Sequence, residues 1–337
     1  MISTRSARRL ALVAALGLAA CGGHGGSGGS GKTFRIALIA KSSTNPVFLS
    51  ARTGADSAAK ELSAQYGVHV IIDWLTPPQE DGQVQAQRVA DAVNGGDNAI
   101  LMSASDASKV TGAINDAVAR GVPVMMFDSD APDSKRFSFY GGDDEAMGRE
   151  VMSELAAQMH DSGKVAILAG NQNAPNLQKR VQGVKEEAAK YPGITIVNVF
   201  NHIETPQDAA AEVLRVQTAY RDLQGWAMIG GWALFTKALL TDLDPNKIKI
   251  VSVDALPAEL AYVDKGLAPV LLAQPTFMWG YQSVHTIFDH VYLKKAVPEH
   301  VVMNLIRVSK DNLGTWARQL KAWGFTDVDP KYLALPN

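Results

Sequence analysis

The feature that most constrains the fold of this chain is a regular alternation of short apolar runs with helical stretches. The apolar runs are mostly continuous and bounded by turn residues, as in Ile36-Ala37-Leu38-Ile39-Ala40. This pattern is typical of parallel strands that are covered on both faces. It predicts strands at residues 34–41, 69–75, 99–104, 123–129, 164–170, 195–201, 225–230, 249–254, 269–274 and 299–309.

Helical patterns occupy the segments between these strands. They predict helices near residues 46–65, 79–94, 106–120, 143–160, 175–190, 206–221, 232–242, 257–265, 275–293 and 311–323. Asp106, Asp143 and Thr205 stand where helix N-caps are expected. Repeated βα units predict an α/β fold with parallel sheets and right-handed crossovers.

The number of strands indicates more than one sheet. Ten strands would make an unusually wide single sheet, so we expect two sheets of about five or six strands each. The seam between them is expected after residues 137–143, because a second α/β run begins at Lys164. Length alone does not show whether the chain crosses back between the two halves.

The N-terminal segment has the layout of an export signal. Arg5, Arg8 and Arg9 precede an apolar run over residues 10–20, which is too short to span a bilayer. The run ends in Leu18-Ala19-Ala20-Cys21, which resembles the bacterial lipobox. The resemblance implies a signal peptide over residues 1–20 and lipidation of Cys21, with residues 21–32 as a Gly/Ser tether. The alternative is a plain secretory signal with a chance cysteine.

Composition and charge argue against several classes of function. Removing residues 1–20 takes away three of the 32 basic residues, which leaves 29 against 34 acidic residues. The resulting net charge near −5 argues against nucleic-acid binding. Cys21 is the only cysteine, so no disulfide forms within the chain, and no H-x-x-x-H pair suggests a zinc site.

Enzyme and nucleotide motifs find no support. Residues 26–33 fit the P-loop expression G-x-x-x-x-G-K-S/T, but a tether precedes them and a strand follows, where a P-loop needs a strand and then a helix. The first predicted strand is not followed by G-x-G-x-x-G, and no G-x-S-x-G elbow occurs. We therefore expect a protein that is not an enzyme and that holds no cofactor or metal.

Polar and aromatic side chains gather after the predicted strands, where open α/β sheets bind ligands. They are Asn45, Phe48, Asp128, Ser129, Asp254 and Gln274. Carboxylates and amides hydrogen-bond hydroxyl groups, and aromatic rings cover the apolar faces of sugars. This set of side chains indicates a site that holds a sugar or polyol.

These features together resemble one family, the type I periplasmic binding proteins of ABC importers, in the ribose- and galactose-binding group. The resemblance covers roughly residues 33–310 and rests on spaced segments. They are Ser43-Thr44-Asn45-Pro46-Val47-Phe48, Gly121-Val122-Pro123-Val124, Phe127-Asp128, Gly141-Gly142-Asp143-Asp144, Arg180 with Gly183-Val184, Val251-Ser252-Val253-Asp254 and Ala273-Gln274.

The resemblance implies two Rossmann-like lobes joined by a three-strand hinge, with the ligand in the cleft between them. Lobe one would hold residues 33–141 and 275–304, and lobe two residues 142–273 and 305–337. The hinge would pass near residues 140–143, 255–258 and 272–276. Closure over the ligand would expose a surface that the membrane transporter recognises.

The resemblance also implies roles for individual residues. Asn45 matches the asparagine of the first loop and Phe48 the stacking aromatic, while Val47 stands where a second aromatic is common. Asp128 matches the aspartate that accepts paired hydroxyls. Ser129 replaces an arginine that often follows it, so a charged donor is missing.

Four further positions would contact the ligand or its surroundings. Asn176 and Arg180 match the contacts from lobe two, although Arg180 could instead pair with Glu186 or Glu187. Asp254 and Gln274 match the hydroxyl-binding aspartate and the hinge glutamine. Asp128 and Asp254 could instead be caps or hinge hydrogen-bonders. Asn45 could be only a turn and helix cap, and Phe48 could be a core residue.

Trp232 is the largest departure from the family pattern, because an Asn-Asp pair is common at this place. Its indole could close the cleft, or it could pack at the start of a helix. Trp74, Trp279 and Tyr281 are expected to be packing residues.

The sequence thus predicts the lipid-anchored substrate-binding component of an ABC importer for a monosaccharide or sugar alcohol. We expect a monomer on the periplasmic face of a bacterial membrane or on the cell surface, with an ABC permease as partner. The alternatives are a nucleoside or furanose-type ligand, and a sensory module that presents its ligand to a receptor.

Overall fold

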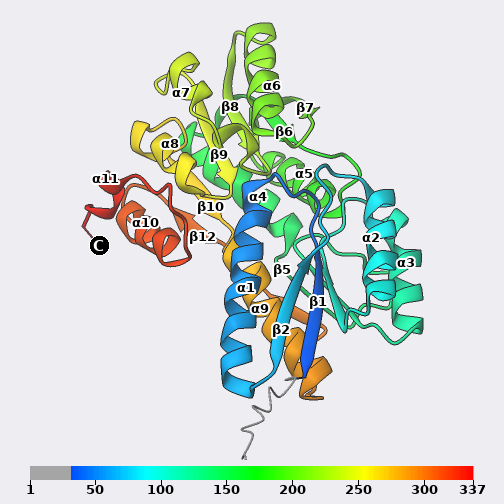
Figure 1. Cartoon of the computed structure of the whole chain (residues 1–337). Coiled ribbons are helices and arrows are strands. Elements are labelled where there is room, and N and C mark those ends of the chain that lie inside the picture. The colour runs from blue at the N-terminus through cyan, green and yellow to red at the C-terminus, as the bar shows by residue number, and fades with distance from the viewer. Residues whose placement is uncertain (1–31, 337) are drawn as a thin grey trace, which may run out of the picture. The chain divides into compact units, whose positions relative to one another are not determined.

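A computed structural model describes residues 32–336, which form an α/β fold with two mostly parallel sheets (Figure 1). This fold confirms the predicted class. The predicted signal peptide, Cys21 and most of the tether lie outside the described residues. Within residues 32–336, no helix is long and apolar enough to cross a membrane.

The first sheet has the strand order β11-β5-β4-β3-β1-β2, and all neighbouring strands pair in parallel. The strands are β1 (Thr33–Ile39), β2 (His69–Trp74), β3 (Ala99–Met102), β4 (Val124–Phe127), β5 (Ser138–Gly141) and β11 (His300–Val302). In register, Ile36 of β1 lies between Ile72 of β2 and Ala99 of β3.

The second sheet has the order β12-β10-β9-β8-β6-β7. Its strands are β6 (Ser162–Ala169), β7 (Gly193–Asn201), β8 (Leu223–Met228), β9 (Lys249–Val253), β10 (Val270–Ala273) and β12 (Ile306–Val308). β12 runs antiparallel to β10, and the other pairs are parallel. The two sheets therefore have the same order of strands. In each sheet, the strand at one edge comes from the C-terminal part of the chain, β11 in the first sheet and β12 in the second.

Helices connect nearly all successive strands. They are α1 (Pro46–Tyr66), α2 (Gly82–Gly95), α3 (Ala107–Ala119), α4 (Asp144–Gln158), α5 (Pro175–Ala188), α6 (Pro206–Ala219), α7 (Ala238–Asp242), α8 (Leu260–Lys265), α9 (Thr276–Ile287), α10 (Leu313–Ala322) and α11 (Pro330–Leu333), with the short turns η1 (Trp232–Leu234), η2 (Pro257–Glu259) and η3 (Phe288–Tyr292). The predicted caps Asp106, Asp143 and Thr205 each accept a backbone N–H at a helix start.

The core of the first sheet follows from the alternation of side chains along β1. Ile36 and Leu38 pack in a cluster with α1 and α9, while Ala37 and Ile39 pack in a cluster with α2 and α3. Figure 1 shows these helix pairs on opposite sides of the sheet. Burial on both faces explains why the strand reads as a continuous apolar run.

Helices α1 and α9 approach each other closely through glycines. A Cβ atom at Gly54 would lie 1.9 Å from the carbonyl oxygen of Phe277, and one at Gly280 would lie 1.8 Å from that of Ala51. Both positions therefore require glycine for the helices to remain in contact. α9 places Trp279, and α1 begins beside Asn45, so this contact supports one wall of the site described below.

The structure corrects one predicted strand and adds one strand that was not predicted. Residues 299–309 were predicted as one strand, but β11 joins the first sheet and β12 the second. Residues 138–141 were predicted only as a seam, but they form β5, between β4 and β11. Strands of three or four residues are too short to show a periodic pattern that would indicate their neighbouring strand. The sequence pattern therefore does not reveal either assignment.

The predicted helices at residues 232–242 and 275–293 are also interrupted. The first divides into η1 and α7, and the second ends in the π-helical turn η3. Trp232 consequently lies in a single tight turn after β8 rather than in a long helix.

Candidate functional site

The side chains predicted at the strand ends meet around one small cavity of about 20 Å³. It is lined by Lys41, Asn45, Val47, Phe48, Asp128, Asn176, Leu177, Arg180, Glu204, Gly230, Trp232, Asp254, Gln274 and Trp279. The predicted ligand residues are therefore brought together, with the exception of Ser129. The walls come from segments that follow strands of both sheets.

Two carboxylates occupy equivalent places in the two sheets. Asp128 directly follows β4 and Asp254 directly follows β9. Their φ angles are +57° and +78°, in the left-handed region that non-glycine residues seldom adopt. The N–H of Asp128 donates to Tyr140 O at 3.0 Å, and that of Asp254 donates to Leu272 O at 2.9 Å. These bonds hold each strained residue at the edge of its sheet.

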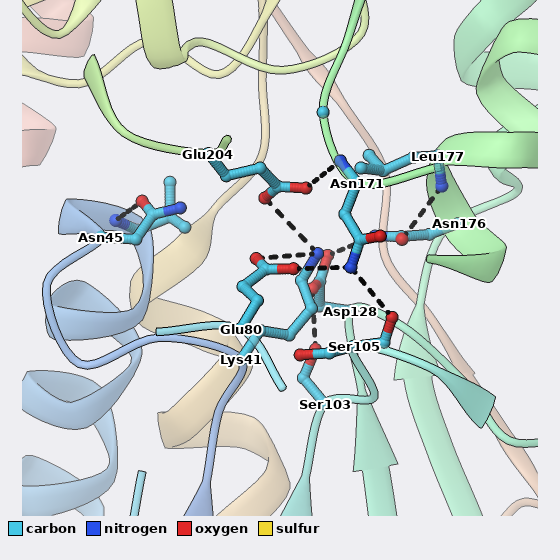
Figure 2. Close-up of polar contacts among 12 residues, drawn as sticks. Lys41, Asn45, Glu80, Ser103, Ser105, Asp128, Asn171, Asn176, Leu177 and Glu204 are labelled. Carbon is cyan, nitrogen blue, oxygen red and sulfur yellow. Dashed lines mark hydrogen bonds and ion pairs between the residues drawn. The ribbon is translucent and has the colours of Figure 1, made fainter. Parts of the chain in front are cut away.

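The Asp128 carboxylate has partners from both sides of the cavity. Ser103 Oγ donates to its Oδ2 at 2.8 Å, and Asn176 Nδ2 donates to its Oδ1 at 3.1 Å (Figure 2). Arg180 approaches the same oxygen at 3.9 Å. Because Ser103 follows β3 and Asn176 begins α5, Asp128 is a meeting point of the two halves of the chain.

Asp254 belongs to a second group of hydrogen bonds. Gln274 Nε2 donates to its Oδ1 at 2.8 Å, and the N–H of Gly231 donates to its Oδ2 at 3.1 Å. Burial raises the pKa of Asp254 above its ordinary value, against the effect of these donors. The carboxylate is thus held in a fixed orientation toward the cavity it lines.

Arg180 connects these groups rather than lying on the surface. Its guanidinium donates to Asp144 Oδ1 at 2.8 Å, to Gln274 Oε1 at 3.0 Å and to Ile229 O at 3.1 Å. The alternative pairing with Glu186 or Glu187 is wrong. Burial raises the pKa of Asp144 to about 6, while the charge of Arg180 opposes this rise.

Asn45 forms the predicted helix cap and lies at the cavity, where its contact with a ligand stays a prediction. Its Oδ1 accepts the N–H of Val47 at 3.2 Å, so it caps α1, and the same residue lines the cavity. Ser129 is fully buried but does not line the cavity. Its carbonyl accepts the N–H of Ala104 at 3.0 Å, so it ties two loops of the first sheet together.

Aromatic rings cover one side of the cavity. Phe48 lies 6.3 Å from Phe127 and 6.0 Å from Trp279 between ring centroids. Trp279, predicted to be a packing residue, is buried and also lines the cavity. The rings of Phe48 and Trp279 supply an apolar part of the cavity lining.

Trp232 combines its two predicted alternatives. It lines the cavity and is only 5% exposed, and its ring meets that of His202 edge to face at 5.1 Å. A Cβ atom at Gly230 would lie 2.4 Å from the indole. Gly230 therefore leaves the space that the large ring fills.

Sequence reasoning missed the charged residues Lys41 and Glu204 among the cavity-lining groups. Lys41 is 2% exposed, and its Nζ lies 3.7 Å from Glu204 Oε2 and 3.5 Å from Glu80 Oε1 (Figure 2). Lys41 follows β1 and Glu204 follows β7. The rule that ligand groups follow strand ends could have found both of them.

The size of the cavity limits what it holds in this arrangement. About 20 Å³ is space for one water molecule, whereas small-molecule sites measure roughly 300–1,000 Å³. A sugar can enter only if the walls separate. Within the described residues, no group of three or more His, Asp or Glu side chains is placed to hold a metal ion.

Two parallel sheets whose carboxyl edges face one polar, aromatic-lined cavity define an α/β ligand-binding domain. A family model described as periplasmic binding protein domain matches residues 36–295. The chain belongs to this family, as its sequence predicted.

Individual relatives agree with this assignment. The chain is 30% identical to the ribose import binding protein RbsB of Bacillus subtilis over 152 residues, which are 45% of this chain and 48% of that protein. It thus aligns with about half the length of that relative. RbsB of Escherichia coli is 24% identical over 255 residues, covering 74% of this chain and 82% of the relative.

Solved structures show the same fold. An ABC transporter solute-binding protein from Burkholderia graminis, in complex with D-arabinose, superposes with a TM-score of 0.77 at 24% identity. The match covers 83% of this chain and 96% of that protein.

Proposed function

We propose that this protein is the substrate-binding component of an ABC importer and that it captures a monosaccharide or sugar alcohol. The observation that carries the proposal is the pair Asp128 and Asp254. Both residues have a strained backbone at equivalent strand ends, and both line one cavity. Arg180 and Gln274 add donors and acceptors, and Phe48 adds an apolar face. Paired hydroxyl groups above an apolar C–H face are the ligand chemistry that matches this set.

The proposed mechanism is capture by closure of two lobes. Lobe one comprises residues 33–141 and 275–304, and lobe two comprises residues 142–273 and 305–337, with the hinge near residues 140–143, 255–258 and 272–276. Ligand enters while the walls are apart, and closure buries it among groups from both lobes. The names of the relatives, which refer to ribose import, support a sugar as the cargo.

Binding measurements on the purified protein test this proposal. D-ribose, D-arabinose, D-xylose, xylitol, adenosine and uridine are screened by thermal shift, and each ligand that raises the melting temperature is titrated by calorimetry. A sugar or polyol should bind with micromolar or tighter affinity. If only adenosine or uridine binds, or none of the panel binds, the proposal of a monosaccharide or sugar alcohol is wrong.

A nucleoside or furanose-type signal is the second candidate. It is favoured by Trp232, whose indole lines the cavity and offers a flat face for a base. Adenosine or uridine would then bind more tightly than ribose, because stacking adds to the ribose contacts. The same titrations decide between the two ligands.

Export and lipidation at Cys21 complete the proposal, with a monomeric, non-catalytic protein that docks on an ABC permease. A sensory module that presents its ligand to a receptor kinase is the alternative use of the same fold. Neighbouring genes for a permease and an ATPase would favour import, and a neighbouring kinase gene alone would favour sensing.

A further inference from the structure

Four side chains form a buried polar cluster beside the cavity, which we call the mouth cluster: Lys41, Glu80, Asn171 and Glu204 (Figure 2). Lys41 and Glu80 follow β1 and β2 of the first sheet. Asn171 and Glu204 follow β6 and β7 of the second sheet. The cluster therefore connects the carboxyl edges of the two sheets.

The members of the mouth cluster contact one another directly. Lys41 Nζ lies 3.5 Å from Glu80 Oε1 and 3.7 Å from Glu204 Oε2. Asn171 Nδ2 donates to Glu80 Oε2 at 3.2 Å, and the N–H of Asn171 donates to Glu204 Oε1 at 2.8 Å. Asn171 Nδ2 also lies 3.2 Å from Ser105 O, which adds a second link to the first sheet.

The mouth cluster stands between two hollows. Lys41 and Glu204 line the inner cavity of about 20 Å³. Glu80, Asn171 and Glu204 line a second hollow of about 520 Å³, together with loop residues such as Ser42, Asp81 and Thr205. Glu204 belongs to both linings, so a molecule that leaves the inner cavity toward the larger hollow has to part these side chains.

The charges of the mouth cluster are almost completely withdrawn from water. The side chains of Lys41, Glu80 and Glu204 are 3%, 11% and 4% exposed. One ammonium faces two carboxyl groups, and two buried carboxylates cannot both ionise beside a single cation without repulsion. Burial, followed by the charge of Glu204, raises the pKa of Glu80 to about 8.

The charge of Lys41 acts in the opposite direction on Glu204. Burial opposes ionisation of Glu204, but the charge of Lys41 and the hydrogen bonds from Glu80 and the N–H of Asn171 together outweigh burial, and the pKa of Glu204 is lowered. The positive charge of Lys41 is balanced by ionised Glu204, and Glu80 lies beside this ion pair as a neutral, protonated acid.

We propose that Lys41, Glu80 and Glu204 are positioning residues that latch the cleft shut over its ligand, and that closing the latch takes up a proton on Glu80. The proposal rests on the proposed function, a binding protein that closes over a sugar. Glu80 faces Lys41, Glu204 and Asn171 directly. The other charged or titratable groups around it are Asp81, Asp106, Lys109 and His202 on the larger hollow and Asp128 and Arg180 beyond Lys41.

The direction of the pH effect follows from the two states of Glu80. When the lobes are apart, Glu80 faces water and titrates near its ordinary pKa of 4.5. The closed state then binds more protons than the open state between pH 4.5 and about 8. Affinity should therefore fall as pH rises through this window, by at most about tenfold per pH unit, and level off above it.

Calorimetry of the full chain tests the proposal with the sugar identified by the panel above. Titrations run from pH 5.5 to 8.5, in buffers of different ionisation enthalpy, on wild type, Glu80→Gln and the control Glu299→Gln, whose side chain is 85% exposed. Wild type and the control should take up protons on binding at pH 7. Glu80→Gln mimics the protonated acid, so it should take up fewer protons and bind at least ~10-fold more tightly than wild type at pH 8. Equal proton uptake and equal pH slopes in all three proteins would overturn the latch.

A second variant tests the cation. Lys41→Met should increase the rate of ligand dissociation at least about tenfold, since loss of one partner of a buried pair acts mainly on dissociation. Stopped-flow displacement measures this rate, and circular dichroism verifies that the variant is folded. An unchanged dissociation rate in the folded variant would contradict the assigned role of Lys41.

Small-angle scattering of the ligand-free protein separates failure of the latch from failure of the proposed function. The radius of gyration of wild type should be larger at pH 8.5 than at pH 5.5, and that of Glu80→Gln should be the same at both. If no sugar binds, the proposed function is wrong and this difference alone decides on the latch. If sugar binds and neither scattering nor proton uptake depends on Glu80, only the latch is wrong.

Discussion

Asn176 Nδ2 donates a hydrogen bond to Asp128 Oδ1 at 3.1 Å, and this bond joins the start of α5 to the end of β4 (Figure 2). The donor belongs to the half of the chain built on the second sheet, and the acceptor belongs to the first sheet. In the small cavity the two side chains are hydrogen-bonded to each other. A ligand hydroxyl that binds Asp128 has to replace this amide or share the carboxylate with it, so binding exchanges one hydrogen bond for another.

Loss of either strand-end carboxylate should weaken ligand binding. A charge-assisted hydrogen bond is worth roughly 1.5–3 kcal/mol, so Asp128→Ala and Asp254→Ala should each bind ~10- to 150-fold more weakly. Asp133→Ala, at an exposed position a few residues after Asp128, is the matched control and should bind like wild type. Calorimetric titration measures the affinities. Wild-type affinity in both cavity variants would remove these carboxylates from the ligand site.

Trp232→Ala should reduce both stability and affinity. The indole is buried in the core of the second sheet and lines the cavity at the same time. Removal of a buried tryptophan costs about 3–5 kcal/mol of unfolding free energy, and loss of an aromatic contact costs about 0.5–1.5 kcal/mol of binding beyond its area. Urea denaturation and calorimetry give the two values.

Trp74→Ala is the control for Trp232, because Trp74 ends β2 and does not line the cavity. It should change stability but leave the ranking of ligands as in wild type. A Trp232→Ala protein that loses stability and keeps full affinity would show that the indole acts only in packing.

Glycine substitutions should distinguish a close helix contact from an open helix face. Gly54→Ala places a Cβ atom 1.9 Å from Phe277 O, so α1 and α9 must move apart, at a cost of about 1–3 kcal/mol. Gly112→Ala in α3 meets nothing within 4 Å and should stabilise the protein by roughly 0.5–1 kcal/mol. Denaturation midpoints of the two variants should shift in opposite directions. Equal shifts would contradict the described approach of α1 to α9.

Cys21→Ser should prevent lipidation and release the protein from membranes. The prediction concerns a residue outside the described range and follows from the lipobox-like Leu18-Ala19-Ala20-Cys21. Membrane fractionation and labelling with a fatty-acid analogue measure the effect. A variant that remains in the membrane fraction with unchanged mobility would show that the anchor is not an acyl chain on Cys21.

Much of the fold could be predicted because its determinants are local. Parallel strands covered on both faces leave continuous apolar runs, and helix caps such as Asp106 and Thr205 leave polar residues at fixed places. The site followed from the same pattern. Asp128, Asp254 and Gln274 each stand directly after a strand, so parallel strands place each of them at the carboxyl edge of its own sheet. Their meeting at one cavity also requires that these edges of the two sheets face each other, which the family resemblance implied.

The remaining features depend on contacts between segments far apart in the chain. Strand β11 pairs with β5, and β12 pairs with β10. A strand of three residues has no sequence pattern that specifies its neighbour in a sheet. Arg180 finds Asp144 rather than a neighbour on its own helix because both are buried beside the cavity. The sequence pattern does not single out Lys41, because buried lysines are rare and its carboxylate partners lie on other loops.

The left-handed backbone of Asp128 and Asp254 lowers stability, and the hydrogen bonds of the two carboxylates offset this cost. Each aspartate holds a conformation that would be relaxed in glycine, at a cost of about 1–2 kcal/mol per residue. Asp→Gly changes at these sites would relieve this strain, but they would also delete the carboxylate and leave its buried hydrogen-bond donors without an acceptor. The side chains that give the cavity its chemistry are therefore also the ones that offset the strain of its backbone. Engineering of this scaffold should accordingly hold both positions fixed and seek stability elsewhere.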